Sequence, residues 1–207
     1  MRCLGGPLLC LLLGLAACSS STPAQTAALP LSGPVAEVIV RQHLLQDGDL
    51  VFRRGRDVMS EMVLSRQAGS RFSHVGMVVT DGQDRRVIHA MPDEPGQPGG
   101  VREETLVDFL APTVAGDAAV YRVSALDDTV RQRLHTYLLA QRGKPFDYDF
   151  AQSTPERLYC SELVISVLEQ AGLTLAPATV RLPLVAEPVI LPDALHRLPG
   201  LIQVAGE

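Results

Sequence analysis

The sequence contains no tryptophan, few other aromatic residues and no excess of positive charge. Its 18 lysine and arginine residues stand against 23 aspartate and glutamate residues, which gives a formal net charge of −5. There is no basic stripe interleaved with aromatic residues, the pattern that binds a phosphate backbone. We therefore expect no nucleic-acid partner. The apolar fraction of 46% is typical of a packed domain, so disorder is not expected beyond the ends.

Long apolar runs are also absent, apart from one at the N-terminus that is too short to span a bilayer. Met1 and Arg2 precede residues 7–17, PLLCLLLGLAA, and together they have the charge and length of a secretory signal peptide. Residues 15–18, LAAC, resemble a bacterial lipobox, in which cleavage occurs just before a cysteine that becomes lipid-modified. We predict a signal peptide at residues 1–17 and lipidation, such as palmitate, at Cys18; an ordinary export signal is the alternative.

Residues 18–34 are predicted to be the lipidated cysteine followed by a flexible tether, because the segment is small, polar and contains proline. Residues 35–207 are long enough for one globular domain with its own core. We expect the N-terminal lipid to hold this domain to the membrane. The expected location is the cell envelope, at the outer membrane and facing the periplasm.

Few cysteines remain after this processing. Cys3 and Cys10 leave with the signal peptide and Cys18 carries lipid, so Cys160 is the one remaining thiol. The domain therefore cannot form an internal disulfide, and an unpaired thiol in an exported protein is open to oxidation. A buried structural role is common for a free cysteine. Export favours the other interpretation, in which Cys160 is a catalytic nucleophile.

The periodicity of apolar residues predicts an α+β fold, with antiparallel strands packed against helices. The predicted strands are residues 49–54, 72–80, 86–91, 118–123 and 201–204. The predicted helices are residues 57–67, 127–142 and 159–170, with a helical or irregular segment at 35–45, a strand that turns into a short helix at 101–110, and a short capped helix at 191–200. Asp81-Gly82 is a hairpin signal, so the strands on either side of it should pair antiparallel.

Cys160 stands in YCSELV, at the first turn of the predicted helix 159–170. Unpaired backbone N–H groups at a helix start favour a thiolate and can hold an oxyanion. His74, at the start of an apolar strand, is the candidate general base, and His89 on the returning strand is the candidate orienting residue. Each histidine also has a structural interpretation, as a hydrogen-bonded strand residue. Glu162 follows on the first turn, where we expect it to cap the helix.

A metal site and a role for the remaining histidines have less support in the sequence. A zinc site made of Cys160, His74 and His89 is chemically possible, but the sequence lacks the closely spaced ligand pairs of structural zinc sites. We therefore expect no metal and no cofactor. The other histidines, which are His43, His135 and His196, are expected to be solvated and receive no role.

Five segments carry a resemblance to a known family: GDLVF, SHVGMVV, VIHA, GKPFDYDF and YCSELV. Together they span residues 47–172, and they resemble the circularly permuted papain-like hydrolases of the YiiX and YaeF type, relatives of NlpC-type cell-wall peptidases. In that permuted group the histidine strand precedes the cysteine helix, as it does here. The resemblance implies a permuted papain-like fold, with Cys160 as nucleophile, His74 as base and His89 as third member, a position that varies in the wider group.

The same resemblance implies a cysteine amidase or peptidase that acts through a thioester acyl-enzyme on peptide or amide substrates of the cell envelope. The order of His, His and Cys also occurs in the lecithin retinol acyltransferase group, so an acyltransferase or lipase acting on lipid is a second hypothesis. A lipoprotein that binds a ligand without turnover is the third. The sequence leaves the substrate and the oligomeric state open.

Overall fold

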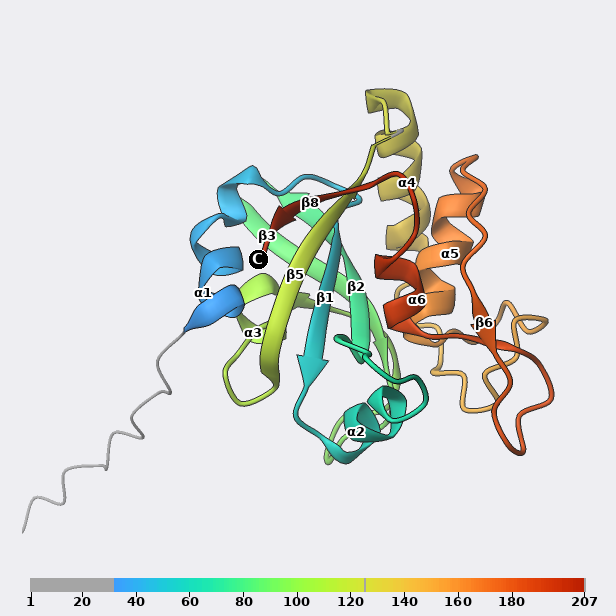
Figure 1. The fold of residues 1–207 in the computed structure, drawn as a ribbon. Helices are drawn as coiled ribbons and strands as arrows, with labels where there is room; N and C mark the ends of the chain where they lie inside the picture. The colour runs from blue at the N-terminus through green and yellow to red at the C-terminus, as the bar shows by residue number, and fades with distance from the viewer. Residues whose placement is uncertain (1–31, 125, 207) are drawn as a thin grey trace, which may run out of the picture.

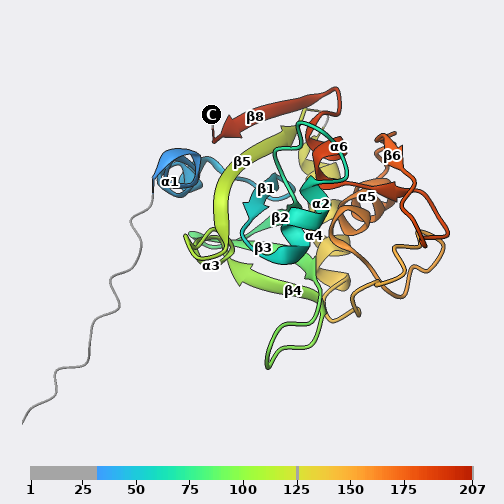
Figure 2. The ribbon, with the colours of Figure 1, turned by 60° about the horizontal axis from the view of Figure 1, so that its bottom comes forward.

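A six-stranded antiparallel sheet forms the centre of the computed structural model, which describes residues 32–124 and 126–206 (Figure 1). Its strands lie in the order β4-β3-β2-β1-β5-β8, and Figure 2 shows β4 and β8 at opposite edges of the curved sheet. The strands of this sheet are β1 Leu50–Gly55, β2 His74–Asp81, β3 Asp84–Met91, β4 Gly100–Thr105, β5 Ala115–Val123 and β8 Leu201–Ala205. A second, two-stranded sheet pairs β6 Thr179–Val180 with β7 Val189–Ile190.

Helices cover both faces of the large sheet (Figure 1). Their bounds are α1 Gly33–Val40, α2 Val58–Leu64, α3 Leu106–Phe109, α4 Asp128–Ala140, α5 Cys160–Gln170 and α6 Pro192–His196, with a 3-10 turn at Gln42–Leu44. The α+β class predicted from periodicity is confirmed. Among the helices of the described residues, none is long and apolar enough to cross a membrane.

The side chains of β2 alternate between two apolar clusters, as the pleat of a strand requires. Val75, Met77 and Val79 are buried against the cluster that includes α4, α5 and α6. Val78 belongs to the other cluster, which includes α1 and α3. A strand buried on both faces explains the nearly continuous apolar run VGMVV, and it fixes the pairing register, since a slip by one residue would exchange the two faces.

The hairpin predicted around Asp81-Gly82 is confirmed. β2 and β3 pair antiparallel, with Asp81 opposite Asp84 and Met77 opposite Ile88. Gly82 has φ +58°, a left-handed conformation that glycine adopts without steric cost. The turn therefore sets the register that brings the two strand histidines to one face of the sheet.

The predicted signal peptide, Cys18 and residues 19–31 of the predicted tether lie outside the described residues. The last two residues of that tether, Gly33 and Pro34, belong to α1 and not to a flexible segment. Proline suits the first turn of a helix because its missing N–H has no intrahelical partner there and its φ is already helical. The helix then buries Val35 and Val38 against the sheet, which explains why the folded domain includes residues before 35.

Two buried aspartates fix the segments that lead into β2 and into α5. Asp193 at α6 accepts the backbone N–H groups of Arg71 and Phe72, at 2.8 and 3.1 Å, and so holds the approach to β2. Asp147, which is fully buried, accepts the N–H groups of Asp149 and Ala151. The motif GKPFDYDF is thus a loop folded around its own carboxylate, and it leads into α5.

The short sheet β6–β7 was not predicted, because each strand has two residues and the surrounding chain is interrupted by proline. It packs beside α5 through a buried hydrogen bond of 3.2 Å from the Ile190 N–H to the Tyr159 hydroxyl. The C-terminal segment is therefore tied to the residue that precedes Cys160.

Candidate active site

Cys160 is the first residue of α5, as the sequence predicts, and it is a free thiol. Its sulfur lies 3.9 Å from the Ser161 hydroxyl oxygen. Burial raises the pKa of the Cys160 thiol and outweighs the opposing effect of the Ser161 hydroxyl and of the backbone N–H groups of Val75 and Ser161. The resting form is therefore the thiol and not the thiolate that a helix start favours.

His74 and His89 meet through their ring nitrogens, with 2.9 Å between His74 Nε2 and His89 Nδ1. His74 is the first residue of β2 and is 7% exposed, while His89 on β3 is fully buried. The Phe109 ring packs against both imidazoles, at centroid distances of 5.7 and 5.0 Å. The contact predicted for the two histidines of this hairpin is thus present, and one imidazole is free to orient the other.

Both imidazoles are neutral at pH 7. Burial, followed by the positive charges of Arg53 and Arg102, lowers the pKa of His74 well below its usual value of 6.5. Burial also lowers the pKa of His89, although Glu104 opposes the shift. A neutral imidazole is the form that can accept a proton from a thiol.

The thiol and the histidine pair meet the sheet at consecutive residues of one strand. Val75, whose backbone N–H lowers the pKa of the Cys160 thiol, directly follows His74. Within the described residues, no hydrogen bond joins the sulfur to an imidazole, and His74 Nδ1 has no hydrogen-bond partner. Nδ1 is therefore the ring nitrogen of His74 that is left to accept a proton.

Charged residues surround the histidine pair, and the sequence reasoning missed them. Arg53 on β1 is 5% exposed; it donates to the Phe109 carbonyl at 2.8 Å and lies 4.4 Å above that ring. Glu104 on β4 lies 3.4 Å from His89 Nε2. Arg53 and Glu104 reach the histidines because of the register in which β1 and β4 pair with the histidine hairpin. No local pattern in the sequence reveals that register.

Glu162 caps α5, as predicted, by accepting the Tyr159 backbone N–H at 3.3 Å. Burial raises the pKa of Glu162 to about 7. The carboxyl is thus partly protonated near neutral pH, and its position on the helix start is structural.

The histidines without an expected role differ in their surroundings. His43 is exposed, as predicted. His196 is half-buried against Phe52 and Phe72, with ring centroids 6.1 and 5.1 Å apart, so its predicted solvation is wrong. The sequence does not indicate this contact, because the position of α6 depends on tertiary packing.

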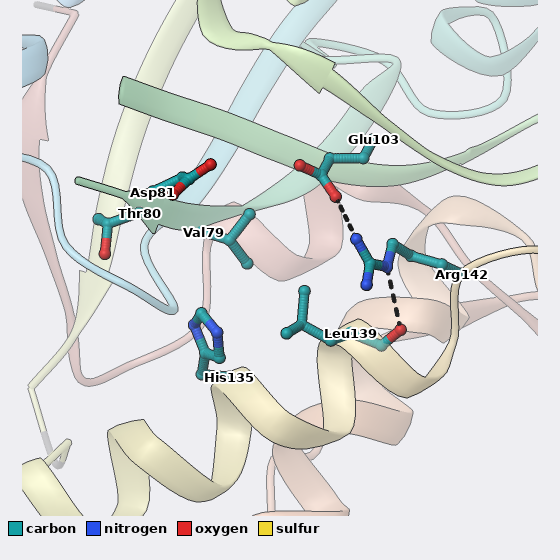
Figure 3. Close-up of a pocket in the computed structure, with 7 residues that line it drawn as sticks. All are labelled: Val79, Thr80, Asp81, Glu103, His135, Leu139 and Arg142. Carbon is teal, nitrogen blue, oxygen red and sulfur yellow. Dashed lines mark hydrogen bonds and ion pairs between the residues drawn. The ribbon is translucent and has the colours of Figure 1, made fainter. Parts of the chain in front are cut away.

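His135 lies in a surface pocket on the α4 side of the sheet, with a volume of about 230 Å³ (Figure 3). Its Nδ1 is at hydrogen-bond distance, 3.0 Å, from Asp47 Oδ2, so this histidine is only partly solvated. Arg142 pairs with Glu103 in the same pocket, at 2.7 Å. Neither Cys160 nor the two strand histidines line it.

Two cavities adjoin the start of β2. A small one, of about 40 Å³, is lined by His74, Arg53 and residues of α2. A larger apolar groove, of about 230 Å³, lies between α2 and the segment 182–191. Met59 and Val63 line both, so these two side chains lie between the groove and the small cavity beside His74.

The order of His74, His89 and Cys160 on two strands and a following helix corresponds to a known family. Residues 44–190 match the model of a permuted papain-like amidase enzyme family, YaeF/YiiX, C92. The chain belongs to this family. It is therefore related to papain-like cysteine hydrolases, with the permuted fold that the sequence predicts. No curated protein matches the chain.

A solved structure is similar over most of the domain. The metalloprotein YiiX of Escherichia coli O157:H7 is 27% identical, with a TM-score of 0.66 over 78% of this chain and 97% of that one. In the described part of the present chain, no three His, Cys, Asp or Glu side chains are grouped as metal ligands. His74 Nε2 and His89 Nδ1 are hydrogen-bonded to each other, so these nitrogens do not fit a metal site. We therefore derive no catalytic step that involves a metal.

Proposed function

We propose that this family member hydrolyses an amide bond through a thioester at Cys160, with His74 as general base and His89 as orienting residue. The observation that carries the proposal is the buried pair of imidazoles, with 2.9 Å between His74 Nε2 and His89 Nδ1, at the start of β2, the strand against which the helix that begins at Cys160 packs. A nucleophile, a base and a residue that orients the base are the minimum set for such catalysis.

In the proposed reaction the Cys160 sulfur attacks the carbonyl carbon while its proton passes to His74 Nδ1. The oxyanion that forms is held by backbone N–H groups at the start of α5. The C–N bond then breaks, and the amine leaves with the proton from His74. Water, deprotonated by the same imidazole, hydrolyses the thioester and restores the thiol.

We also propose that the chain is a lipoprotein of the cell envelope, with Cys18 lipidated and the domain facing the periplasm. Support comes from the sequence of residues 1–18 alone. Peptide and amide groups of the envelope are then the substrates within reach. Mass spectrometry of the membrane-extracted protein tests this directly: a diacylated or triacylated N-terminal Cys18 is expected, and an unmodified or differently cleaved N-terminus contradicts it.

A second candidate function is hydrolysis or transfer of a fatty acyl group, and the apolar groove favours it. Its lining includes Met59, Met62, Phe150, Leu182 and Leu191, and its one charged residue is Arg66. The groove has room for an acyl chain, and it shares Met59 and Val63 with the small cavity that His74 lines. An apolar side chain of an amide substrate would fit the groove equally well. The two functions therefore differ in the leaving group, which is an amine for the amidase and an alcohol for the lipid hydrolase.

The test compares peptidoglycan-derived peptides with phospholipid vesicles, using the full chain and three variants. Cys160→Ser and His74→Asn are expected to abolish turnover, because they remove the nucleophile and the base. His135→Asn is the matched control, since His135 lies in the separate pocket on the α4 side (Figure 3). Released amine supports the amidase, and released fatty acid supports the second candidate. Turnover that persists in Cys160→Ser contradicts both, and absence of any turnover favours a binding protein.

A further inference from the structure

A carboxylate lies beside the second ring nitrogen of His89. Glu104 Oε2 is 3.4 Å from His89 Nε2, at ion-pair distance but off the line of an ideal hydrogen bond. In the described residues no other acceptor reaches this nitrogen, and His89 is fully buried. Because a buried N–H needs an acceptor, Glu104 is the group that can satisfy it.

Glu104 is itself held in place on β4. Its Oε1 is 2.8 Å from Arg102 Nε, and Arg102 lies directly opposite His89 in the β3–β4 register. Burial alone would raise the pKa of Glu104, but the nearby His89 ring, at 3.4 Å, and the charges of Arg102 and Arg53 lower it to about 2. The carboxylate is thus charged, and acts only as an acceptor, across the working pH range.

We propose that Glu104 is a positioning residue that sets the proton arrangement of the His89–His74 pair. The inference rests on the proposed function of Cys160 and His74, and it adds a fourth group to the three considered there. Glu104 does not contact the reacting atoms; it acts through His89.

Two neutral imidazoles joined by one hydrogen bond can carry their protons in two arrangements. If His89 carries its proton on Nε2, toward Glu104, its Nδ1 is an acceptor and receives the Nε2–H of His74. His74 Nδ1 then has a free lone pair that can accept the thiol proton. In the opposite arrangement, His74 Nδ1 carries a proton and cannot act as a base, while a lone pair on His89 Nε2 faces the carboxylate. Glu104 therefore favours the productive arrangement.

Glu104 also opposes the positive charge around the pair. The charged groups near the imidazoles are Arg53 on β1, Asp57 at the start of α2, Glu94 in the loop before β4, and Arg102 and Glu104 on β4. When His74 accepts a proton, Arg53 and Arg102 repel the new charge. Glu104 is the negative group in contact with the pair, so its charge stabilises the imidazolium–thiolate state.

The test measures alkylation of Cys160 by iodoacetamide between pH 5 and pH 10, using the full chain and peptide mass spectrometry. This probe needs no knowledge of the substrate. In Glu104→Gln the rate of alkylation at pH 7 should fall about tenfold, because the imidazolium that accompanies the thiolate loses a neighbouring negative charge worth about one pKa unit. Glu104→Asp, which keeps the charge, should remain near the wild-type rate.

Glu103→Gln is the matched control. Glu103 precedes Glu104 on β4, and the two side chains have similar exposed fractions, 18% and 22%. It pairs with Arg86 and with Arg142, of which Figure 3 shows the second, and as a neighbour of Glu104 in the strand it lies on the opposite face of the sheet. Its alkylation rate at pH 7 should equal that of wild type. A Glu104→Gln rate equal to that of Glu103→Gln overturns the inference.

Two further measurements distinguish a failure of this inference from a failure of the proposed function. His74→Asn should slow alkylation at pH 7; if it does not, the proposed base is wrong, whatever Glu104 does. If His74→Asn slows alkylation and Glu104→Gln changes nothing, only the role of Glu104 fails. Should Glu104→Gln not fold, nitrogen NMR of the wild-type imidazoles decides: a proton on His89 Nε2 is expected, and a proton on His89 Nδ1 contradicts the inference.

Discussion

Asp193→Ala tests how α6 supports the segment that leads to His74. The Asp193 side chain is 1% exposed, and its Oδ1 accepts the N–H groups of Arg71 and Phe72 at 2.8 and 3.1 Å. Its other oxygen lies 2.5 Å from the Arg197 guanidinium. Removing the carboxylate therefore leaves two backbone donors without an acceptor just before β2.

The expected loss of stability follows from those donors. A buried donor left unsatisfied costs about 1–3 kcal/mol, and Phe72 is fully buried while Arg71 is partly exposed. The ion pair adds little, because the Arg197 side chain is 44% exposed. We expect the free energy of unfolding to fall by about 3 kcal/mol in total. For a domain of this size the midpoint temperature should fall by about 6–12 °C.

Urea and thermal unfolding, followed by circular dichroism, measure both quantities. Asp127→Ala is the control, since Asp127 accepts one backbone N–H, that of Val130, at 2.7 Å at the exposed start of α4. Loss of such a cap costs about 1 kcal/mol. If Asp193→Ala destabilises the protein no more than Asp127→Ala, the role assigned to the buried carboxylate is refuted.

Two other changes have equally definite outcomes. In Gly76→Ala the new Cβ would overlap Val87 Cγ1 and lie 3.1 Å from His89 Cβ, so unfolding in urea should show a loss of about 1–3 kcal/mol; stability equal to wild type would mean that the hairpin has room for a methyl group. The pKa of Glu162 is raised from 4.5 to about 7 in the folded protein, so this group makes the protein less stable as pH rises from 4.5 through 7. Glu162→Gln should therefore gain stability relative to wild type at pH 8 but not at pH 4, and an unchanged difference between the two pH values would contradict the shift.

Much of the site was predictable because it depends on local patterns. The Asp81-Gly82 turn fixes which residues of β2 and β3 are neighbours, and so brings His74 to His89. The start of α5 at Cys160 follows from the apolar period of the helix.

The charges around the imidazoles were not predictable from such patterns. Glu104 and Arg102 read as ordinary polar residues of a short strand, and only the β3–β4 register directs them to His89. Arg53 lies in a strand that is predicted correctly, yet its burial beside Phe109 depends on α3 covering the sheet. The raised pKa of the Cys160 thiol was not predictable either. It results from burial, which depends on the packed structure and outweighs the effect of the helix start.

The most direct test of the central claim is acylation of the full chain by p-nitrophenyl acetate, a generic acyl donor. The acetyl group should appear as a thioester on the Cys160 peptide, and p-nitrophenolate should be released. A general base contributes about 10²–10⁴-fold, so His74→Asn should slow acylation at least 100-fold while His135→Asn leaves it unchanged. Acetylation at another residue, or an equal rate in His74→Asn and wild type, would contradict the assignment of Cys160 as nucleophile and His74 as its base.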